Sequence, residues 1–192
     1  MNSIKVTTME PRALIINDRE ELSRKVSALK ELGNVIVLTQ GAYDMIHTGH
    51  LRYLEKAKYH GDILIVAIDT DELVKHRKGE DRPFDPEDER FETISRLRGV
   101  DIIISKTLQE DKHDIIKLIH PDVFIISRST GEEIQADIEE FGKMCGEVIN
   151  LEPQSSNSTT AKFRKLRSGH FKGLKEAINK LFDNYLETGG KK

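Results

Sequence analysis

The stretch GAYDMIHTGH, residues 41–50, places two histidines, His47 and His50, three positions apart. It follows the apolar run NVIVLT, which predicts a strand, and residues with helical spacing come after it. Gly41 lets the chain turn sharply off the strand, and Gly49 leaves space above the first helical turn, where free N–H groups favour an anion. Because imidazole N–H groups at this spacing can point to one place, the pattern predicts a site that holds a polyphosphate and stabilises charge developing on it.

Other interpretations of these residues stay open at this point. A single histidine is more often a surface or core residue than a ligand, and Asp44 could serve as a helix cap alone. Two histidines three apart could also bind a metal ion, but such a site needs a third ligand, and none is evident nearby. We predict no metal ligands, because the strand, the glycines, the carboxylate and the histidines together fit a phosphate site better.

The elements that must position these residues alternate along the chain. Short runs rich in Val and Ile predict strands that are buried on both faces, as in a parallel sheet. These runs are 34–39, 62–68, 101–105, 122–127 and 147–151. The segments between them carry helix signals, such as the capping box of Asp18 with Glu21 and the helix-ending Gly33. The alternation predicts an α/β fold whose ligands lie at the carboxyl ends of the strands.

Two polar stretches are expected at the same edge of the sheet as the histidines. HRKGEDRPFDPED, residues 76–88, contains Arg77 and Lys78. We expect it to be a mobile loop that clamps phosphate groups on binding, and a solvated run of charges is the alternative. EPQSSNSTT, residues 152–160, offers hydroxyl groups to phosphate oxygens. Arg90 could fix the first loop, touch phosphate or lie on a helix surface.

The motif at 41–50 resembles the G-x-F-D-x-x-H-x-G-H signature of the cytidylyltransferase-like nucleotidyltransferases, with Tyr43 in place of the usual Phe. The resemblance continues through GDILIVAIDTDE, RKGEDRP, DER and GVDIII, returns at NSTTAKFRKL, and covers residues 33–166. The helical segment 18–32 and the spacing RKG..RP are most similar to the bacterial heptose 1-phosphate adenylyltransferases, and glycerol-3-phosphate cytidylyltransferases are also similar. The resemblance implies a Rossmann-like, doubly wound parallel sheet of about five strands, with an N-terminal and a C-terminal helix.

The family resemblance also implies a reaction. A nucleoside triphosphate and a phosphorylated small molecule give a nucleotidyl product and pyrophosphate, by in-line attack of the acceptor phosphate on the α-phosphorus. Catalysis is then mainly positioning and electrostatic stabilisation, with Mg²⁺ carried by the nucleotide. His47, His50 and Lys78 are the expected catalytic residues, and Arg77 is expected to bind the acceptor. The expected nucleotide-binding residues are Gln40, Gly41, Ala42, Tyr43, Asp44, Gly49, Ser158, Thr159 and Thr160.

One segment departs from the family pattern. After the fourth strand, heptose adenylyltransferases usually carry K-G-x-D and glycerol-phosphate enzymes G-D-D, whereas this chain reads ISRST at 126–130. That strand end normally helps to form the acceptor pocket. We therefore predict that Arg128 binds an anionic group of the acceptor, and a solvated loop residue is the alternative.

We expect adenylyl transfer from ATP to a sugar phosphate. The alternatives are cytidylyl transfer from CTP to a polyol or amino-alcohol phosphate, and a regulatory protein that binds nucleotide without turnover. The formal net charge of -3 argues against a general nucleic-acid binder. No apolar run approaches the roughly 20 residues of a membrane span. Cys145 is the only cysteine, and the N-terminus does not look like a signal peptide, so a reducing, cytoplasmic location is expected.

Three regions are expected along the chain. They are an N-terminal extension and helix over 1–33, a nucleotidyltransferase domain over 34–166, and a C-terminal helix and tail over 167–192. Apolar residues at helical spacing between 174 and 185 predict a packing or dimer helix, and hence a homodimer.

Overall fold

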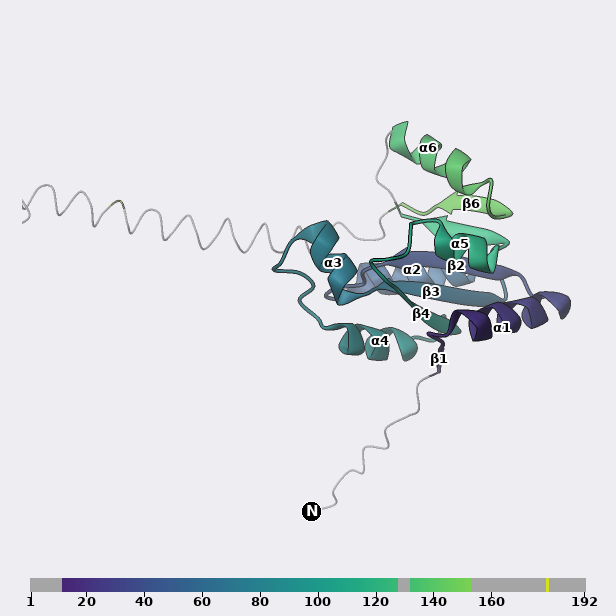
Figure 1. Cartoon of the computed structure of the whole chain (residues 1–192), viewed down its shortest axis with the longest axis horizontal. Coiled ribbons are helices and arrows are strands. Elements are labelled where there is room, and N and C mark those ends of the chain that lie inside the picture. The colour runs from purple at the N-terminus through teal and green to yellow at the C-terminus, as the bar shows by residue number, and fades with distance from the viewer. Residues whose placement is uncertain (1–11, 128–131, 153–178, 180–192) are drawn as a thin grey trace, which may run out of the picture. The chain divides into compact units, whose positions relative to one another are not determined.

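The computed structural model describes residues 12–127, 132–152 and Asn179, and the first two ranges belong to one compact unit, Met1–Gln154. This unit contains a six-stranded sheet in the order β1-β4-β3-β2-β5-β6, in which every neighbouring pair is parallel (Figure 1). The strands are β1 (Leu14–Ile15), β2 (Ile36–Gly41), β3 (Ile63–Asp69), β4 (Ile102–Lys106), β5 (Val123–Ile126) and β6 (Glu147–Asn150). The helices are α1 (Arg19–Glu31), α2 (Thr48–Lys58), α3 (Asp71–Lys78), α4 (Glu87–Ser95), α5 (Asp114–Ile119) and α6 (Glu132–Phe141).

The sheet is buried on both faces, as its Val- and Ile-rich strands predict. Successive strand residues point to opposite faces, so the strands β2 to β5 contribute to two separate core clusters. One cluster packs against α2 and α4 through residues such as Leu54 and Ile94. The other packs against α1, α5 and α6, with Leu22 and Phe141 among its members. The doubly wound α/β architecture expected from the sequence is therefore confirmed.

The first helix begins where its capping signal predicts. The Asp18 carboxylate accepts a hydrogen bond from the Glu21 backbone N–H at 2.7 Å. This contact satisfies one of the donors that the first turn of a helix leaves without a partner. Leu22 and Val26, one turn apart, are then buried against the sheet. The N-terminal helix is thus part of the core and covers one face of the sheet.

The sheet has six strands rather than about five. The additional strand is β1, where Leu14 and Ile15 pair with Ile102 and Ile103 at the edge of the sheet. A two-residue strand is too short to give a periodic pattern, which explains why the sequence did not indicate it. The short helix α5 was not predicted either.

Helix α3 corrects the predicted extent of the polar loop. The segment 76–88 was expected to be irregular, but α3 includes Arg77 and Lys78, so the loop comprises residues 79–86. Thr70 caps the helix by accepting from the Leu73 N–H, and Gly79, at a φ of 100°, ends it. The first turn of α3 contains acidic residues and its last turn contains basic residues. Both interact favourably with the helix dipole, so this polar segment forms a helix.

The order of the strands creates a switch point beside β2. The chain runs outward from β2 through β3 to β4 and then returns to place β5 on the other side of β2. The carboxyl ends of β2 and β5 therefore border a crevice, the usual ligand site of such a sheet. Within the described part of the chain, no helix combines the length and apolar content needed to cross a membrane. The predicted helix between 174 and 185 lies, apart from Asn179, outside the described residues.

Candidate active site

His47 is the residue that starts helix α2. Its backbone is extended, and its Nδ1 accepts a hydrogen bond from the Gly49 N–H at 3.0 Å. The imidazole thus takes the capping role that Ser or Asp usually fills. Because Nδ1 is an acceptor, the proton of the neutral ring lies on Nε2. This tautomer leaves Nε2 as the hydrogen-bond donor of His47.

His50 lies one turn further along α2 and stacks on His47. The two ring centroids are 4.1 Å apart, with an angle of 23° between the planes. Burial lowers the pKa of His50 to about 4, and the neighbouring His47 and Lys78 act in the same direction. His50 is therefore a neutral imidazole at physiological pH. Its buried Nδ1 has no hydrogen-bond partner among the described residues.

The backbone before α2 is held in an unfavourable conformation. Tyr43 and Met45 both have a φ of 50°, which residues other than glycine seldom adopt. Tyr43 is buried, and its ring lies against Gly41, where a Cβ atom would come within 3.2 Å of it. A side chain at position 41 would therefore require the Tyr43 ring to shift by a few tenths of an ångström. Strained residues of this kind persist when surrounding contacts fix them, and they gather at functional sites.

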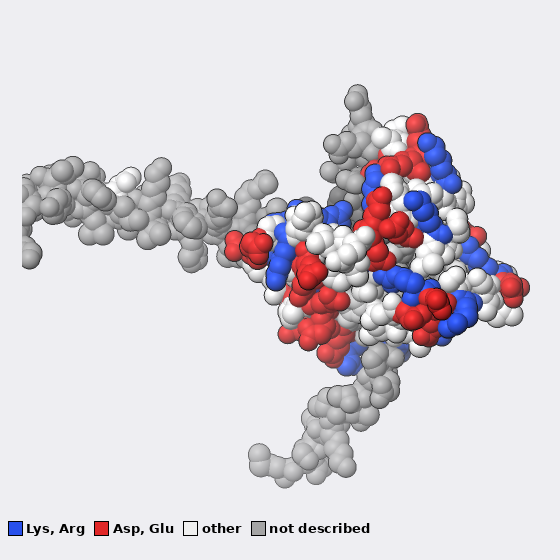
Figure 2. Space-filling view, in the orientation of Figure 1, with Lys and Arg blue, Asp and Glu red and all other residues white. Residues whose placement is uncertain are grey.

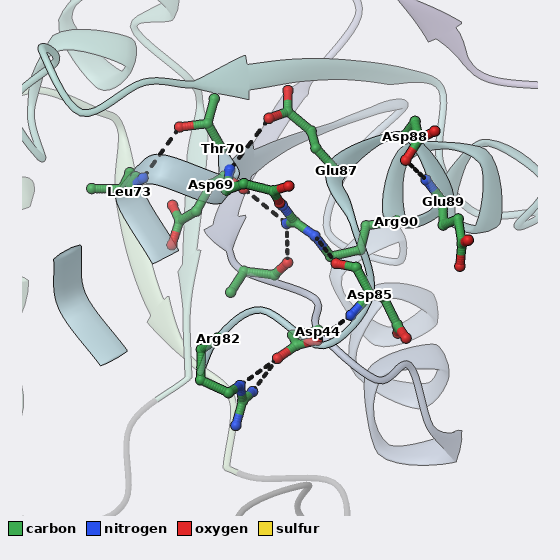
Figure 3. A network of polar contacts seen from close by, with 12 residues as sticks. Asp44, Asp69, Thr70, Leu73, Arg82, Asp85, Glu87, Asp88, Glu89 and Arg90 are labelled. Atoms are coloured by element: carbon green, nitrogen blue, oxygen red, sulfur yellow. Dashed lines mark hydrogen bonds and ion pairs between the residues drawn. The ribbon is translucent and has the colours of Figure 1, made fainter. Parts of the chain in front are cut away.

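Asp44 is the residue that connects the motif to the loop at 79–86. Its buried carboxylate accepts from Arg82 Nε at 2.6 Å and from the backbone N–H groups of Phe84 and Asp85 at 2.9 and 3.1 Å (Figure 3). Asp85 in turn accepts from the Met45 N–H at 2.8 Å. These reciprocal contacts hold the strained backbone at Met45 and give Asp44 a structural role in the site.

Arg90 is buried at the base of the same network. Its guanidinium group donates to the carbonyl oxygens of Ala42 (2.6 Å), Asp69 (2.8 Å) and Asp85 (3.0 Å) and to the Asp71 carboxylate (2.7 Å) (Figure 3). Of the roles considered for Arg90, the structure therefore supports fixing the loop. One side chain from α4 joins the segments that follow β2 and β3.

A pocket of about 440 Å³ opens at the carboxyl ends of the strands. Residues 40–42 line it from β2, and residues 124–127 line it from β5. Its cationic side chains are Arg77, Lys78, Lys106 and Lys112, and its carboxylates are Asp69 and Asp137. The pocket therefore lies at the switch point and contains more positive than negative side chains, which suits a ligand with several phosphate groups.

The two cations of α3 are held differently from what the sequence predicts. Arg77 forms an ion pair with Asp69, with 3.1 Å between Nη1 and Oδ2. Desolvation lowers the pKa of Lys78, and the charges of Arg82 and Arg77 add to the effect. Because the charge of Lys78 lowers the pKa of His50, Lys78 links the pocket to the histidine pair. Both cations lie on the last turn of a helix instead of on a loop.

Lys106 is a pocket residue that the sequence did not indicate. It ends β4, is 3% exposed, and donates from Nζ to Gln40 Oε1 at 2.7 Å. Desolvation lowers its pKa, whereas the Asp69 carboxylate raises it. A lysine that follows an apolar strand matches no motif. The register that places Lys106 beside Asp69 follows from the strand pairing in the structure, so the sequence carried no signal for it.

Comparison with known proteins gives this arrangement a family. The family model described as cytidylyltransferase-like matches residues 38–183, most of the chain. The chain belongs to the cytidylyltransferase-like family. The resemblance identified from the motif is thereby confirmed, and the chain is placed among nucleotidyltransferase enzymes.

Two proteins called HldE are similar to this chain over most of its length. The protein called bifunctional protein HldE from Nitratiruptor sp. is 35% identical over 160 residues, which make up 82% of this chain and 33% of HldE. The HldE from Klebsiella pneumoniae is 35% identical over 79% of the chain and 32% of its own length. The chain thus spans about a third of the length of these relatives.

Two solved structures are also similar to the cytidylyltransferase-like chain. A lipopolysaccharide core biosynthesis protein from Thermoplasma volcanium has a TM-score of 0.51 and 27% identity, over 62% of this chain and 97% of that one. Pantoate-beta-alanine ligase from Francisella tularensis has a TM-score of 0.55 and 13% identity, over 77% and 69% of the two chains. The second likeness shows the fold alone.

Of the described residues that the sequence selected, five line the pocket, and the lining residues do not include His47 or His50. Gln40, Gly41, Ala42, Arg77 and Lys78 line the pocket. Tyr43, Asp44 and Gly49 are buried within the motif, and His47 and His50 lie at the start of α2. The remaining predicted residues, Arg128, Ser158, Thr159 and Thr160, lie outside the described residues.

Proposed function

We propose that this cytidylyltransferase-like chain transfers AMP from ATP to the phosphate group of a sugar phosphate and releases pyrophosphate. The observation that carries the proposal is the stacked pair of His47 and His50, next to a cation-rich pocket at the switch point of a parallel sheet. The similarity of segment 18–32 and of RKG..RP to heptose 1-phosphate adenylyltransferases favours ATP and a sugar. A relative described as a lipopolysaccharide core biosynthesis protein supports a sugar acceptor.

The proposed reaction needs positioning and charge stabilisation more than proton transfer. An oxygen of the acceptor phosphate attacks the α-phosphorus, the bond to the β-phosphate oxygen breaks, and pyrophosphate leaves with that electron pair. His47 donates from Nε2 to the triphosphate, because its Nδ1 is already an acceptor. His50 stays neutral and stacks on the ring of His47. Donors that are fixed before the reaction stabilise the charge that develops in the transition state.

Mg²⁺ would enter this reaction with the nucleotide. The described residues contain no group of three or more His, Cys, Asp or Glu side chains that could hold a metal ion. Mg²⁺ usually keeps several waters and binds through substrate phosphates, which suits a pocket with this donor set. The ion would neutralise part of the charge on the triphosphate, next to Lys78 and the histidines.

We also propose that the chain forms a homodimer. Its support is the helical spacing of apolar residues between 174 and 185. Sedimentation velocity of the whole chain tests it, and a single species with the mass of one chain at all concentrations would contradict it.

The proposed activity is tested by pyrophosphate release from ATP, CTP, GTP and UTP with a panel of sugar, polyol and amino-alcohol phosphates. We expect release with ATP and an aldose 1-phosphate such as heptose 1-phosphate. Release with CTP and glycerol 3-phosphate would instead support the cytidylyltransferase alternative. Nucleotide binding without release for any acceptor would indicate a regulatory protein. A double variant, His47→Asn with His50→Gln, controls for contaminating activity.

A further inference from the structure

Lys106 occupies an unusual position for a lysine. Its side chain is almost completely buried, and its one hydrogen bond among the described residues goes to the neutral amide oxygen of Gln40. Within the described ranges its ammonium group makes no ion pair within 4.0 Å. A buried charge without a directly bound counter-ion is costly to maintain. An anionic ligand in the adjoining pocket would offset this cost.

The surroundings of Lys106 have an excess of positive charge. Arg77, Lys78 and Lys106 line the side of the pocket at the ends of β3 and β4, where Asp69 is the described carboxylate. Asp69 Oδ2 is already paired with Arg77, and Asp69 Oδ1 is buried without a hydrogen-bond partner among the described residues. The pocket thus has four cations against the carboxylates of Asp69 and Asp137. Although Glu110 and Asp111 also raise the pKa of Lys106, this side of the pocket suits an anion.

The position of Lys106 in the sheet separates the two substrates. In a doubly wound sheet the nucleotide occupies the crevice at the switch point, here between β2 and β5. Lys106 ends β4, two strands from β2 and on the opposite side from β5. Lys106 lines the β4 side of the pocket that Gln40 lines from β2, and this side position favours an anion carried by the second substrate.

We propose that Lys106 is an acceptor-binding residue whose ammonium group receives an anionic oxygen of the acceptor phosphate. This inference rests on the proposed function, because that function defines the acceptor. Gln40 orients the ammonium group in the free protein through the hydrogen bond at 2.7 Å. Arg77 and Lys78 supply the other positive charges on the same side of the pocket.

The variant Lys106→Met tests the proposal, because methionine keeps an unbranched apolar side chain of similar length and removes the charge. With ATP and heptose 1-phosphate, we expect the acceptor KM from pyrophosphate release to rise about 10- to 150-fold, as for the loss of one charge-assisted hydrogen bond. The Kd of ATP, measured by titration calorimetry, should stay unchanged.

Lys58→Met is the matched control. Lys58 is also partly buried, with 29% of its side chain exposed, and it pairs with Asp101 at 2.6 Å. Asp101 immediately precedes β4, at the opposite end of that strand from Lys106. Lys58→Met should lower the Tm, because Asp101 loses its partner, whereas only Lys106→Met should change the acceptor KM. A wild-type acceptor KM in Lys106→Met would overturn the proposal and leave Lys106 as a support for Gln40.

A second measurement keeps the inference separate from the proposed function. If no acceptor yields pyrophosphate, the proposed function fails, and inorganic phosphate serves as the probe at constant ionic strength. A phosphate-dependent rise in Tm that Lys106→Met loses and Lys58→Met retains would support an anion site at Lys106. An equal rise in both variants, or no rise in the unmodified protein, would overturn that site as well.

Discussion

His47 has two separate tasks, one for each ring nitrogen. Nδ1 caps α2 through the Gly49 N–H, and Nε2 is the donor that we propose for the triphosphate. The capping task depends on an acceptor close to the backbone, which asparagine also provides. The second task depends on the far side of the imidazole ring. The two contributions of His47 can therefore be separated by substitution.

We predict that His47→Asn retains the stability of the protein but lowers kcat by roughly 10²–10³, as the loss of one transition-state donor does. His47→Ala should lower kcat similarly and also lose about 1 kcal/mol of stability, because the cap is removed. Urea unfolding and pyrophosphate release measure the two effects. Near-wild-type turnover in both variants would contradict the catalytic role of His47.

His50 is predicted to make the protein less stable as the pH falls. Its pKa is about 4 in the folded protein, below the ordinary value of 6.5, so the unfolded chain binds more protons between these values. Stability that is present above pH 6.5 is lost as the pH falls toward 4. Between pH 7 and pH 5, the contribution of His50 should decrease by about 2 kcal/mol.

The variant His50→Gln should remove this contribution. Urea unfolding at pH 7, 6 and 5 measures it as the difference between the unmodified protein and the variant. His60→Gln is the control, because His60 lies beyond the end of α2. An equal loss of stability with pH in His50→Gln and in the unmodified protein would show that His50 does not titrate below its ordinary pKa.

At the scale of elements, Arg90 connects α4 to the segments that follow β2 and β3. Arg90→Met should lower the free energy of unfolding by about 3–5 kcal/mol, because Asp71 and three carbonyl oxygens lose a buried partner. The control is Arg96→Met, at the residue that follows α4. This change removes an exposed ion pair with Glu92 and should lower the free energy of unfolding by about 0.5 kcal/mol or less. Similar losses in denaturant titrations of both variants would contradict the role of Arg90.

The sequence predicted the elements whose patterns are local. The capping box at Asp18 and the apolar runs of five strands indicated α1 and the main sheet within a few residues. Elements that depend on tertiary pairing were missed, such as the two-residue strand β1. The last turn of α3 was assigned to the loop 76–88 because its composition is polar, although Thr70 supplies a cap at the start of the helix.

In the candidate site, too, local patterns were predicted and contacts between distant positions were missed. His47 and His50 carried a recognisable spacing, but the capping role of His47 depends on the backbone conformation at the start of α2. The contact of Asp44 with Arg82 spans 38 residues, and that of Lys106 with Gln40 spans 66. Contacts between positions so far apart follow from the order and register of the strands, which the sequence pattern does not specify.

At the scale of the whole molecule, charge is distributed unevenly. The chain has a formal net charge of -3, and Figure 2 shows acidic side chains gathered over the start of α4, where Glu87, Asp88 and Glu89 form the first turn. The pocket at the carboxyl ends of the strands has four cations and two carboxylates. Attraction of an anionic substrate therefore depends on local charge at the pocket, since the net charge of the protein opposes it.

A nucleotide that binds at the carboxyl edge of the sheet should stabilise the whole unit Met1–Gln154, although it contacts only a few strand ends. At about 100 times its Kd, ATP should raise the free energy of unfolding by about 2.7 kcal/mol. In hydrogen exchange, added protection should concentrate at the carboxyl ends of β2 and β5, which border the pocket, and at the start of α2, where His47 is the proposed phosphate donor. Adenosine is the control, because it lacks the phosphates that the cations and His47 would bind. An equal gain in stability with adenosine at the same concentration, or protection spread evenly to the amino ends of the strands, would contradict a phosphate-binding site at the switch point.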